Sequence, residues 1–477
     1  MNLEEAIQHP VFEVIREAAE QLEKPAYVVG GFVRDVLMGR PQKFDIDILT
    51  EGSGIDLAKK TAKALDKDIQ VVVFKRFGTA MFSYKGMDWE FVGARKESYS
   101  PDSRKPAVEN GSLQDDQQRR DFTINAMAIS LNADNYGLLL DPFEGEKDLQ
   151  KKIIRTPLDP NITYSDDPLR MMRAIRFAAQ LNFDIEHDSF VAIGKNAARL
   201  DIVSRERIMS EFNKIMLSDR PGYGLQLLHK TKLLERFLPE LTRLQGVEEI
   251  EGNTHKDNLY HTFEVVDNIA ENTDSLWLRW AALLHDIGKA PTKRYDEKAG
   301  WTFHSHEFVG SKMVPKIFRR LSLPMGPEMK YVKKLVHLSS RPIPLVDEEA
   351  TDSALRRLLF DAGDDLEDLF TLCKADITTK NAQKQQRYKS NFNAVLEKLR
   401  DVEERDQVRN FQPPVSGEDI MKCFGIKPGE VIGTIKSRIK EAILEGELVN
   451  DREQALEYMK KLGAELGLEF ADDVPKK

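Results

Sequence analysis

Two aspartates, Asp45 and Asp47, stand one residue apart in the stretch FDIDIL at residues 44–49. Because side chains alternate along a β-strand, both carboxylates would lie on one face, with Phe44 and the two isoleucines on the other, facing a core. Two carboxylates so close repel each other unless a cation lies between them, and hard oxygen ligands suit Mg²⁺ shared with substrate phosphates. The alternative is an exposed edge strand that alternates charges for solubility.

Residues on either side of this strand extend the same chemistry. Gly30 and Gly31 precede it, and glycine lets a backbone approach phosphates closely, just before the N-terminus of a short helix. Arg34 can add a charge-assisted contact. Glu90, in the later strand MDWEFVGA, is the best candidate for the third carboxylate of a two-metal site, with Asp88 on the same face. A solvated strand face is the alternative for this later pair.

The hydrophobic pattern predicts the elements that must position these residues. Apolar and alternating runs predict strands at 26–29 and 44–49 and in the stretches IQVVVF, TAMFSY and MDWEFVGA; helical spacing predicts helices over 3–24, 33–38 and 55–65. From about residue 146 the pattern becomes helical with few strand signals. A Pro/Gly-interrupted linker at 408–420 precedes a last helical segment at 428–466. The first 95 residues are therefore mixed α/β, and the rest is mainly helical.

Length and composition narrow the class of protein. A chain of 477 residues should divide into three or four domains, and 41% hydrophobic with 31% charged residues is typical of a globular protein. With a net charge of −9, a nucleic-acid partner would have to be met by local basic patches. Two cysteines argue against a disulfide framework and fit a reducing cytosol. The acidic N-terminus is unlike a signal peptide, and no apolar run approaches the roughly 20 residues that span a bilayer.

Longer motifs carry a family resemblance. GGFVRD followed by FDIDI resembles the polymerase-beta-like nucleotidyltransferase signature. RRDFTINAMA (119–128), LLLDPFEGEKDLQKKIIRT (138–156) and DDPLRMMRAIRFAAQL (166–181) follow in the order found in class II CCA-adding enzymes, the tRNA nucleotidyltransferases. The resemblance covers about the first 245 residues. Bacterial poly(A) polymerases are close relatives, but they usually carry an Arg-rich segment before the D-x-D strand, where this chain has GRPQKF.

The resemblance implies an α+β protein with a nucleotidyltransferase head of mixed sheet and helices, followed by helical domains. The expected divisions are head 1–145, helical neck 146–248, a domain at 249–380 whose motif LLHDIGK (283–289) resembles the HD superfamily, and a helical, tRNA-binding tail 381–477. The implied reaction is template-independent addition of CCA to tRNA from CTP and ATP by two-metal chemistry with Mg²⁺, in the cytoplasm, without a membrane or DNA partner. Poly(A) synthesis, partial addition of CC or A only, and an HD phosphohydrolase with a degenerate nucleotidyltransferase half remain open, as does the oligomeric state.

The motif at 166–181 offers a means of choosing bases. Asp167 and Arg170 are three residues apart and would share a helix face. A carboxylate accepts hydrogen bonds and a guanidinium donates them, which matches the amino group and ring nitrogen that cytosine and adenine share. The resemblance assigns this templating role to the same positions. The alternative is that Asp167 only caps a helix that begins at Pro168. Arg170, Arg173 and Arg176 recur every three residues and can line a triphosphate channel.

Neighbouring motifs supply further candidates. Arg120 and Asp121 can hold the sugar and phosphates of an incoming nucleotide, while Asn125 is expected to fix the turn. The stretch GSLQDDQQ just before them resembles the mobile loop that the family uses when it switches from C to A. In SRERIMSEFNKIM (204–216), a resemblance to the last neck motif implies that Glu206, Arg207 and Glu211 brace helices.

A second constellation lies further along the chain. Six of the nine histidines fall between residues 255 and 337, and LLHDIGK, FHSHE and CKAD fit the HD superfamily of metal-dependent phosphohydrolases. In such a site, imidazoles and carboxylates from several helices converge on Mg²⁺ or a divalent transition metal. The implied ligands are His261, His285, Asp286 and Asp376. His306 and His337 are candidates for a second ion or for phosphate. A retained helical fold with unrelated histidines is the alternative.

Overall fold

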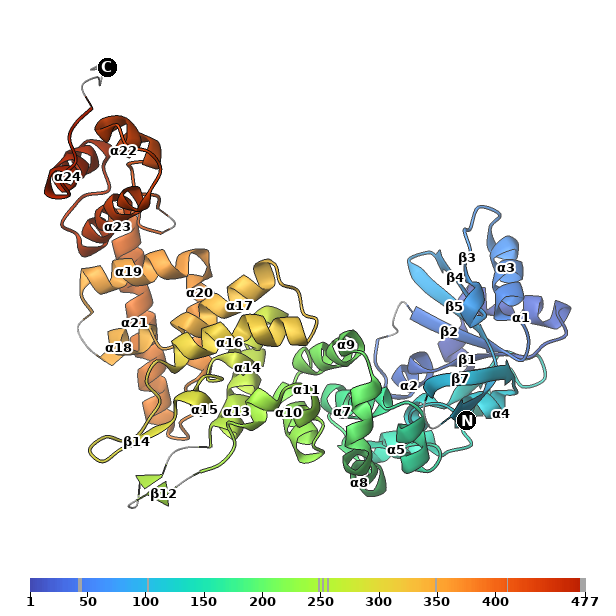
Figure 1. The fold of residues 1–477 in the computed structure, drawn as a ribbon. Coiled ribbons are helices and arrows are strands. Elements are labelled where there is room, and N and C mark those ends of the chain that lie inside the picture. The colour runs from blue at the N-terminus through green and yellow to red at the C-terminus, as the bar shows by residue number, and fades with distance from the viewer. Residues whose placement is uncertain are drawn as a thin grey trace. The chain divides into compact units, whose positions relative to one another are not determined.

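The computed structural model describes residues 1–41, 45–100, 103–247, 249–250, 253–254, 257–347, 350–409 and 411–471. The chain divides into two compact units, Met1–Thr242 and Arg243–Lys477, which we call the N-terminal and C-terminal units. Figure 1 shows a mixed sheet with helices near the N-terminus, followed by helices for most of the remaining chain. The expected α+β class, with a mixed head followed by helical domains, is confirmed.

A seven-stranded sheet organises the head of the N-terminal unit. The strands follow the order β3-β4-β5-β2-β1-β8-β9, and β2 pairs with β5 in parallel while the other neighbours are antiparallel. Their bounds are β1 Ala26–Val29, β2 Asp45–Thr50, β3 Val72–Phe74, β4 Thr79–Tyr84, β5 Met87–Gly93, β8 Ala128–Ser130 and β9 Leu139–Leu140. The strand predicted at 44–49 is therefore β2, although Phe44 lies outside the described residues.

Alternation along the strands gives this sheet two different faces. Ile46 and Ile48 of β2 are buried on one face, together with Trp89 and Phe91 of β5. The indole of Trp89 lies edge-on to Phe12 of α1 (Pro10–Gln21), with ring centroids 5.1 Å apart. Helix α1 also packs on α3 (Gly54–Leu65), which lies against β4 and β5. The opposite face therefore carries Asp45, Asp47 and their cross-strand neighbours.

Short elements complete the head. They are the 3-10 helices Glu4–Ile7, Lys75–Phe77 and Thr123–Asn125, helices α2 Gly31–Leu37, α4 Leu113–Gln118 and α5 Gly145–Lys151, and the hairpin of β6 Arg95–Ser100 with β7 Ser103–Asn110. The helix predicted over 3–24 is wrong in its extent. Pro10 has no N–H and stands at the first helical position, so α1 starts there, and the His9 ring accepts a hydrogen bond from the Val11 amide at 3.4 Å.

The segment GSLQDDQQ forms α4. Ser112 and Asp115 make a reciprocal capping box, in which each side chain accepts a hydrogen bond from the other residue's backbone N–H. The structure therefore has a capped helix where the family resemblance predicted a mobile loop.

Helices make up most of the rest of the N-terminal unit. They are α6 Pro160–Asp166, α7 Leu169–Leu181, α8 His187–Asn196, the 3-10 helix Ala197–Ile202, α9 Arg205–Met216, α10 Pro221–Lys230, α11 Leu234–Phe237 and α12 Pro239–Thr242. Two short strands, β10 Ile153–Ile154 and β11 Asp184–Ile185, pair in parallel. Helix α7 packs against α9, and its buried side chains include Met171, Ile175 and Ala178.

The described C-terminal unit is helical apart from two small hairpins, β12 Glu249–Ile250 with β13 Asn253–Thr254 and β14 Arg294–Asp296 with β15 Gly300–Thr302. Its helices are α13 Asn258–Ala270, α14 Leu276–Leu284, α15 Lys289–Thr292, α16 His306–Arg320, α17 Pro327–Leu338, α18 Pro342–Asp347, α19 Asp352–Ala362, the 3-10 helix Gly363–Asp365, α20 Leu366–Ala375, α21 Ala382–Asp406, α22 Gly417–Phe424, α23 Glu430–Glu445 and α24 Arg452–Glu465. The last predicted segment, 428–466, is broken at Gly446, whose φ of 80° ends α23.

Candidate active site and metal centre

The carboxylates of the head lie side by side on neighbouring strands. Asp45 pairs in register with Asp88, and Asp47 with Glu90, across the parallel β2–β5 ladder. Burial raises the pKa of Asp47 to about 6. The charge of Arg120 opposes this rise, and the charges of Glu90, Asp45 and Asp116 add to it. Burial and Asp45 also raise the pKa of Glu90. Carboxylates that raise one another's pKa in this way repel one another when ionised. A bound divalent cation would relieve this repulsion, and carboxylate oxygens are suitable ligands for it.

Gly30 brings the backbone close to these carboxylates. Its φ is 77°, which favours glycine, and a Cβ there would lie 3.0 Å from Oδ2 of Asp47 and 3.4 Å from Nη1 of Arg120. The turn therefore admits no side chain between the start of α2 and Asp47. The close approach to phosphates predicted for Gly30 and Gly31 stays a prediction.

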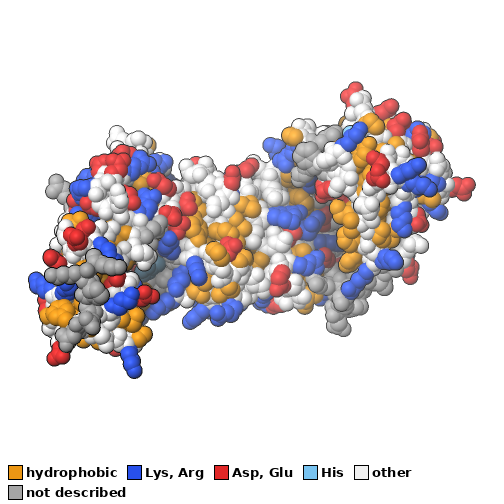
Figure 2. All heavy atoms as spheres, turned by 90° about the horizontal axis from the view of Figure 1, so that it is seen from above, with side chains coloured by type: hydrophobic (Ala, Val, Ile, Leu, Met, Phe, Trp, Pro, Cys, Tyr) orange, Lys and Arg blue, Asp and Glu red, His pale blue; other side chains and the backbone are white. Residues whose placement is uncertain are grey.

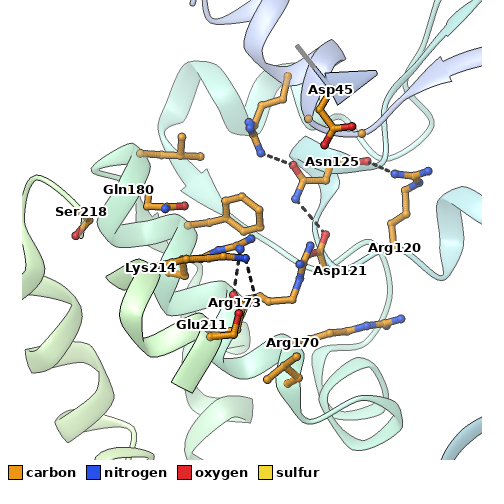
Figure 3. Close-up of a pocket in the computed structure, with 18 of the residues that line it drawn as sticks. Asp45, Arg120, Asp121, Asn125, Arg170, Arg173, Gln180, Glu211, Lys214 and Ser218 are labelled. Atoms are coloured by element: carbon orange, nitrogen blue, oxygen red, sulfur yellow. Dashed lines mark hydrogen bonds and ion pairs between the residues drawn. The ribbon is translucent and has the colours of Figure 1, made fainter. Parts of the chain in front are cut away.

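A cavity of about 1100 Å³ opens beside Asp45 and Asp47, within the N-terminal unit. Figure 3 shows side chains from the head and from helices α7 and α9 pointing into it. The predicted residues that line the cavity are Gly30, Gly31, Arg34, Asp45, Asp47, Arg120, Asp121, Asp167, Arg170, Arg173 and Arg176. Glu90 lies outside this lining, one strand further from β1.

A buried polar network fixes the turn that carries Asp121. Arg34 donates to Asp35 at 2.8 and 2.9 Å and to Oδ1 of Asn125 at 2.9 Å. Asn125 in turn donates to Oδ1 of Asp121 at 3.1 Å, and Arg173 donates to Oδ2 of Asp121 at 2.7 Å. Burial alone would raise the pKa of Asp121, but Arg173 and Asn125 keep it below its usual range. The scaffold role expected for Asn125 fits these contacts.

Asp167 and Arg170 stand at the start of α7. Oδ1 of Asp167 accepts a hydrogen bond from the Leu169 amide at 3.2 Å, while Oδ2 lies 4.0 Å from Nη2 of Arg207. Pro168 already has helical dihedral angles, so Asp167 caps the helix as in the simpler alternative. Asp167 and Arg170 still line the cavity, and Arg170 donates to the Arg119 carbonyl at 2.6 Å. Capping and base reading are therefore compatible.

Arg176 is held differently from Arg170. Its Nη1 lies 3.1 Å from Oε2 of Glu211 on α9, and both side chains are less than 10% exposed. The Arg176 guanidinium also lies over the Phe177 ring, 4.2 Å from its centroid. Burial lowers the pKa of Arg176 despite Glu211. The bracing role predicted for Glu211 fits this contact.

Two residues at this site were not predicted: Asp116, buried behind the arginines of the cavity wall, and Lys214, which lines the cavity. Asp116 is fully buried and accepts hydrogen bonds from both Arg119 and Arg120, the latter at 2.9 Å from Nε. Lys214 of α9 also points toward the cavity in Figure 3. The sequence signal for Asp116 was its spacing, three and four residues before the two arginines on a helix. Lys214 had no comparable signal, because its place depends on how α9 packs on α7.

A second cluster of ionisable groups lies in the C-terminal unit. One ligand atom from each of His261, His285 and Asp286 lies within 4.8 Å of the others. Oδ1 of Asp376 lies 2.8 Å from Nε2 of His261 and 3.5 Å from Nε2 of His285. The structure therefore brings together all four ligands that the HD resemblance implied, from helices α13, α14 and α20 or the residues directly after them.

Each of three histidines in this cluster has a polar partner at Nδ1 that fixes the orientation of its ring. Nδ1 of His285 lies 2.7 Å from the Ala282 carbonyl, Nδ1 of His306 lies 2.9 Å from the Phe303 carbonyl, and Nδ1 of His261 lies 3.2 Å from the Thr378 hydroxyl. Such bonds direct Nε2 of each ring toward the carboxylates, as in histidines that bind metals. Within the described chain, Nε2 of His285 and Oδ1 of Asp376 are buried atoms without a hydrogen bond. The donor set therefore fits a divalent cation.

Charge within the cluster supports the same conclusion. Burial alone would lower the pKa of His285, but Asp286 and Asp376 raise it to about 10. Burial alone would likewise raise the pKa of Asp286, but His285, His306 and Lys289 hold it well below its usual range. The buried Asp286 and its partly exposed neighbour Asp376 thus require positive charge nearby, which a proton or a metal can provide.

The two further histidines are placed differently. Nε2 of His306 lies 3.5 Å from Oδ1 of Asp286, at the rim of the cluster. His337 is exposed on α17 and packs against Phe308, with ring centroids 6.2 Å apart. The structure therefore brings His306 to the cluster and leaves His337 out of the four-ligand set.

Charged side chains of both signs are spread over the face shown in Figure 2, with hydrophobic side chains between them. Among the described helices, we find none with the length and apolar character needed to cross a membrane.

Three segments match known domain families. Residues 26–155 match the Poly A polymerase head domain, residues 182–244 the probable RNA and SrmB-binding site of polymerase A, and residues 258–368 the HD domain. Nucleotidyltransferase and HD domains generally use divalent metals.

Whole-chain comparisons extend these matches. The chain is 29% identical over 463 residues to a CCA-adding enzyme of Ligilactobacillus salivarius, covering 95% of each. It is 36% identical over 299 residues to an A-adding tRNA nucleotidyltransferase of Aquifex aeolicus, covering 60% of this chain but only 35% of that protein. A crystal structure of the Bacillus stearothermophilus CCA-adding enzyme in complex with CTP has the same fold, with a TM-score of 0.69 at 24% identity, covering 96% of this chain and 99% of that one.

A third relative decides the family. The chain is 31% identical over 351 residues to an A-adding tRNA nucleotidyltransferase of Deinococcus radiodurans, and the alignment covers 72% of this chain and 78% of that protein. Together with the paired carboxylates, the arginine-lined cavity and the HD cluster, this places the chain in the tRNA nucleotidyltransferase family.

Proposed function

We propose that this chain adds the nucleotides of CCA to the 3′ end of tRNA from CTP and ATP, without a nucleic-acid template. The observation that carries the proposal is one cavity with paired carboxylates at one end and an Asp/Arg pair in its wall. Relatives named CCA-adding enzymes that align over 95% of the chain support it. The proposed divisions remain head 1–145, neck 146–248, HD domain 249–380 and tail 381–477, in the cytoplasm where tRNA is processed.

The catalytic residues in this proposal are Asp45, Asp47 and Glu90, which would hold Mg²⁺ at the surface of β2 and β5. When bound, Mg²⁺ would activate the 3′-hydroxyl of the tRNA and neutralise charge on the triphosphate. The chain itself would orient the reactants. Gly30 and Gly31 leave room for phosphates at the start of α2, and Arg120 and Arg173 would hold the triphosphate between fixed partners.

Base selection would depend on Asp167 and Arg170. Oδ2 of Asp167 can accept a hydrogen bond from the amino group of cytosine or adenine, because Oδ1 already caps the helix. Arg170 can donate to the adjacent ring nitrogen. Uracil and guanine place a carbonyl and a ring N–H at these positions, so each would leave a polar group unpaired at a cost of about 1–3 kcal/mol.

A second candidate is addition of the terminal A only. Two relatives that align at 36% and 31% identity are named A-adding tRNA nucleotidyltransferases, which is a higher identity than the 29% found with the CCA-adding relative from L. salivarius. One Asp/Arg pair can serve both bases, so the described site is compatible with either product.

Three tRNA substrates separate these candidates: one lacking CCA, one ending in C and one ending in CC. The purified protein is incubated with each, Mg²⁺ and labelled CTP or ATP, with Asp45→Ala as the inactive control. Full CCA addition predicts growth of all three substrates, whereas A addition predicts growth of the third with ATP only. Repeated A addition to any RNA would indicate a poly(A) polymerase, and no incorporation would refute the nucleotidyltransferase proposal.

For the HD cluster we propose a divalent cation held by His261, His285, Asp286 and Asp376, with His306 at its rim. When bound, it would supply an activated water for phosphoester hydrolysis. Metal analysis of the purified protein, compared with His285→Ala, tests the ligand set directly. Activity on phosphomonoesters and 2′,3′-cyclic phosphates tests hydrolysis.

A further inference from the structure

An exposed apolar strip lies at the edge of the head sheet, on the same face as the catalytic carboxylates. Register pairs Asp47 with Glu90, Glu90 with Met81 and Met81 with Val72, so these four side chains form one row across β2, β5, β4 and β3. Phe74 is two residues beyond Val72 and shares this face. The row therefore runs from the carboxylates to the sheet edge.

The apolar side chains of this strip are unusually exposed to solvent. Val72 is 51% exposed, Phe74 42% and Phe77 58%, within six residues of one another. Single exposed apolar residues are common on proteins, but three adjacent ones that include two phenylalanines form a patch. Helices α1 and α3 cover the opposite sheet face at β4 and β5, so the patch lies on the side of the sheet away from these helices.

Basic side chains lie within the patch. Lys75 and Arg76 separate the two phenylalanines and are exposed, and the Arg76 guanidinium lies 6.0 Å from the centroid of the Phe77 ring. Exposed aromatic rings that alternate with cations are the combination that binds single-stranded nucleic acid, because bases stack on the rings and phosphates contact the cations.

The geometry of the reaction indicates which part of the RNA would lie on this apolar strip. Arg34 and Arg120 of the cavity contact Asn125, just before β8, and Arg120 lies beside Gly30, just after β1. Because β1 and β8 follow β2 on the side away from β5, these arginines lie on the β1 side of Asp47, and the triphosphate with its leaving pyrophosphate belongs there. In nucleotidyl transfer the attacking and leaving oxygens lie roughly in line, on opposite sides of the phosphorus. The attacking 3′-hydroxyl must therefore approach from the other side of Asp47, over Glu90, Met81 and Val72.

We infer that the strip formed by Val72, Phe74, Phe77 and Met81, with Lys75 and Arg76, is a stacking platform for the unpaired 3′-terminal nucleotides of the RNA that is extended. The inference rests on the proposed function, since it names the subsite for the acceptor strand of the same reaction. It assigns sequence-tolerant binding to β3 and the residues after it, and base choice to α7.

The test uses the full-length protein and a tRNA ending in CC, with 2-aminopurine in place of one of the last two nucleotides. Stacking quenches 2-aminopurine, so quenching on binding without ATP reports the platform directly. In the Phe74→Ala/Phe77→Ala variant, we expect the quenching to disappear and the KM for tRNA to rise about 5- to 100-fold, with the KM for ATP unchanged. Phe74→Trp should retain quenching. Phe308→Ala, on α16 and 48% exposed, is the matched control that should change neither value.

The outcomes separate the platform from the proposed reaction. Unchanged quenching and KM in an active double variant would overturn the platform and leave nucleotide addition intact. A double variant that changes only the sedimentation behaviour would overturn it as well, because the strip would then be a contact between copies of the chain. Quenching that the double variant loses, in a protein that adds no nucleotide, would support the platform and refute the reaction. Lys75→Gln/Arg76→Gln should reduce the salt slope of RNA binding by about 0.7 for each charge, and an unchanged slope would contradict the phosphate contacts.

Discussion

The pair Arg176–Glu211 gives the sharpest test of how this cavity is built. The sequence pattern predicted that Arg176 lines a triphosphate channel, whereas its guanidinium lies 3.1 Å from Glu211 and links α7 to α9. Replacing Glu211 with Gln removes the charge and keeps the size of the side chain. If Arg176 mainly braces the two helices, this substitution should destabilise them; if Arg176 mainly binds triphosphate, it should free a cation for the nucleotide.

The expected size of the effect follows from the burial of both groups. At 3.1 Å and an effective dielectric constant of about 20, the attraction between unit charges is about 5 kcal/mol. Desolvation opposes part of it, but removing one partner leaves an uncompensated buried charge, which typically costs about 3–5 kcal/mol. We therefore expect Glu211→Gln to lower local stability by about 3 kcal/mol. Arg176→Gln/Glu211→Gln should recover about 2 kcal/mol of the summed single losses.

Hydrogen exchange of the amides in α7 and α9 measures this quantity locally, without requiring the whole chain to unfold in one step. A loss of 3 kcal/mol corresponds to exchange that is faster by about two orders of magnitude. Nucleotide binding is measured on the same variants. Additive effects of the two single substitutions, or a weaker affinity for CTP and ATP in Arg176→Gln with exchange unchanged, would refute the bracing role.

Three other predictions concern the two sites. Asp47→Asn should abolish nucleotide addition yet raise stability at pH 7 in the presence of a chelator, by about 1–2 kcal/mol in urea unfolding. The reason is that a carboxyl whose pKa is raised to about 6 stabilises the folded state only while protonated, and this stabilisation is lost between pH 4 and 6; an equal or lower stability would contradict it. His285→Ala with Asp286→Ala should remove bound metal and any phosphohydrolase activity while nucleotide addition stays nearly unchanged; a parallel loss of addition in a folded protein would contradict the separation of the sites. Asp167→Ala and Arg170→Ala should lower the preference for C and A over U and G by roughly ten- to a hundredfold in competition assays, and a uniform loss of rate would leave Asp167 only as a helix cap.

Local patterns predicted the elements of the head well. The strands at 26–29 and 44–49 and the helix at 55–65 match β1, β2 and α3 within one residue at each end, because alternation and helical spacing are local properties. The first helix was predicted to be too long, since the apolar spacing runs through Pro10 although the backbone cannot. Sheet order was not predictable in this way, because β1 lies between β2 and β8 through contacts far apart in sequence.

Residue types predicted which side chains reach the sites, but not how they pair there. The four implied HD ligands converge, since a fixed helical framework and distinctive histidine spacing carry that information. For the arginines, spacing indicated a shared helix face, yet their partners come from other elements. Asp121 meets Arg173 and Glu211 meets Arg176 across turns and helices more than 30 residues apart, which no local pattern encodes.

These pairings explain how a cavity can carry many arginines before a nucleotide arrives. Arg120, Arg173 and Arg176 each have a carboxylate partner, so their guanidinium groups are held in place and their buried charge is compensated. Arg170 differs, because it has no ion pair with any described residue and donates one hydrogen bond to a backbone carbonyl. Its other N–H groups remain available at the cavity wall beside Asp167. In the proposed function, Arg170 would need such free donors to read a base edge, whereas arginines that meet phosphate could share their charge with a carboxylate and still attract it.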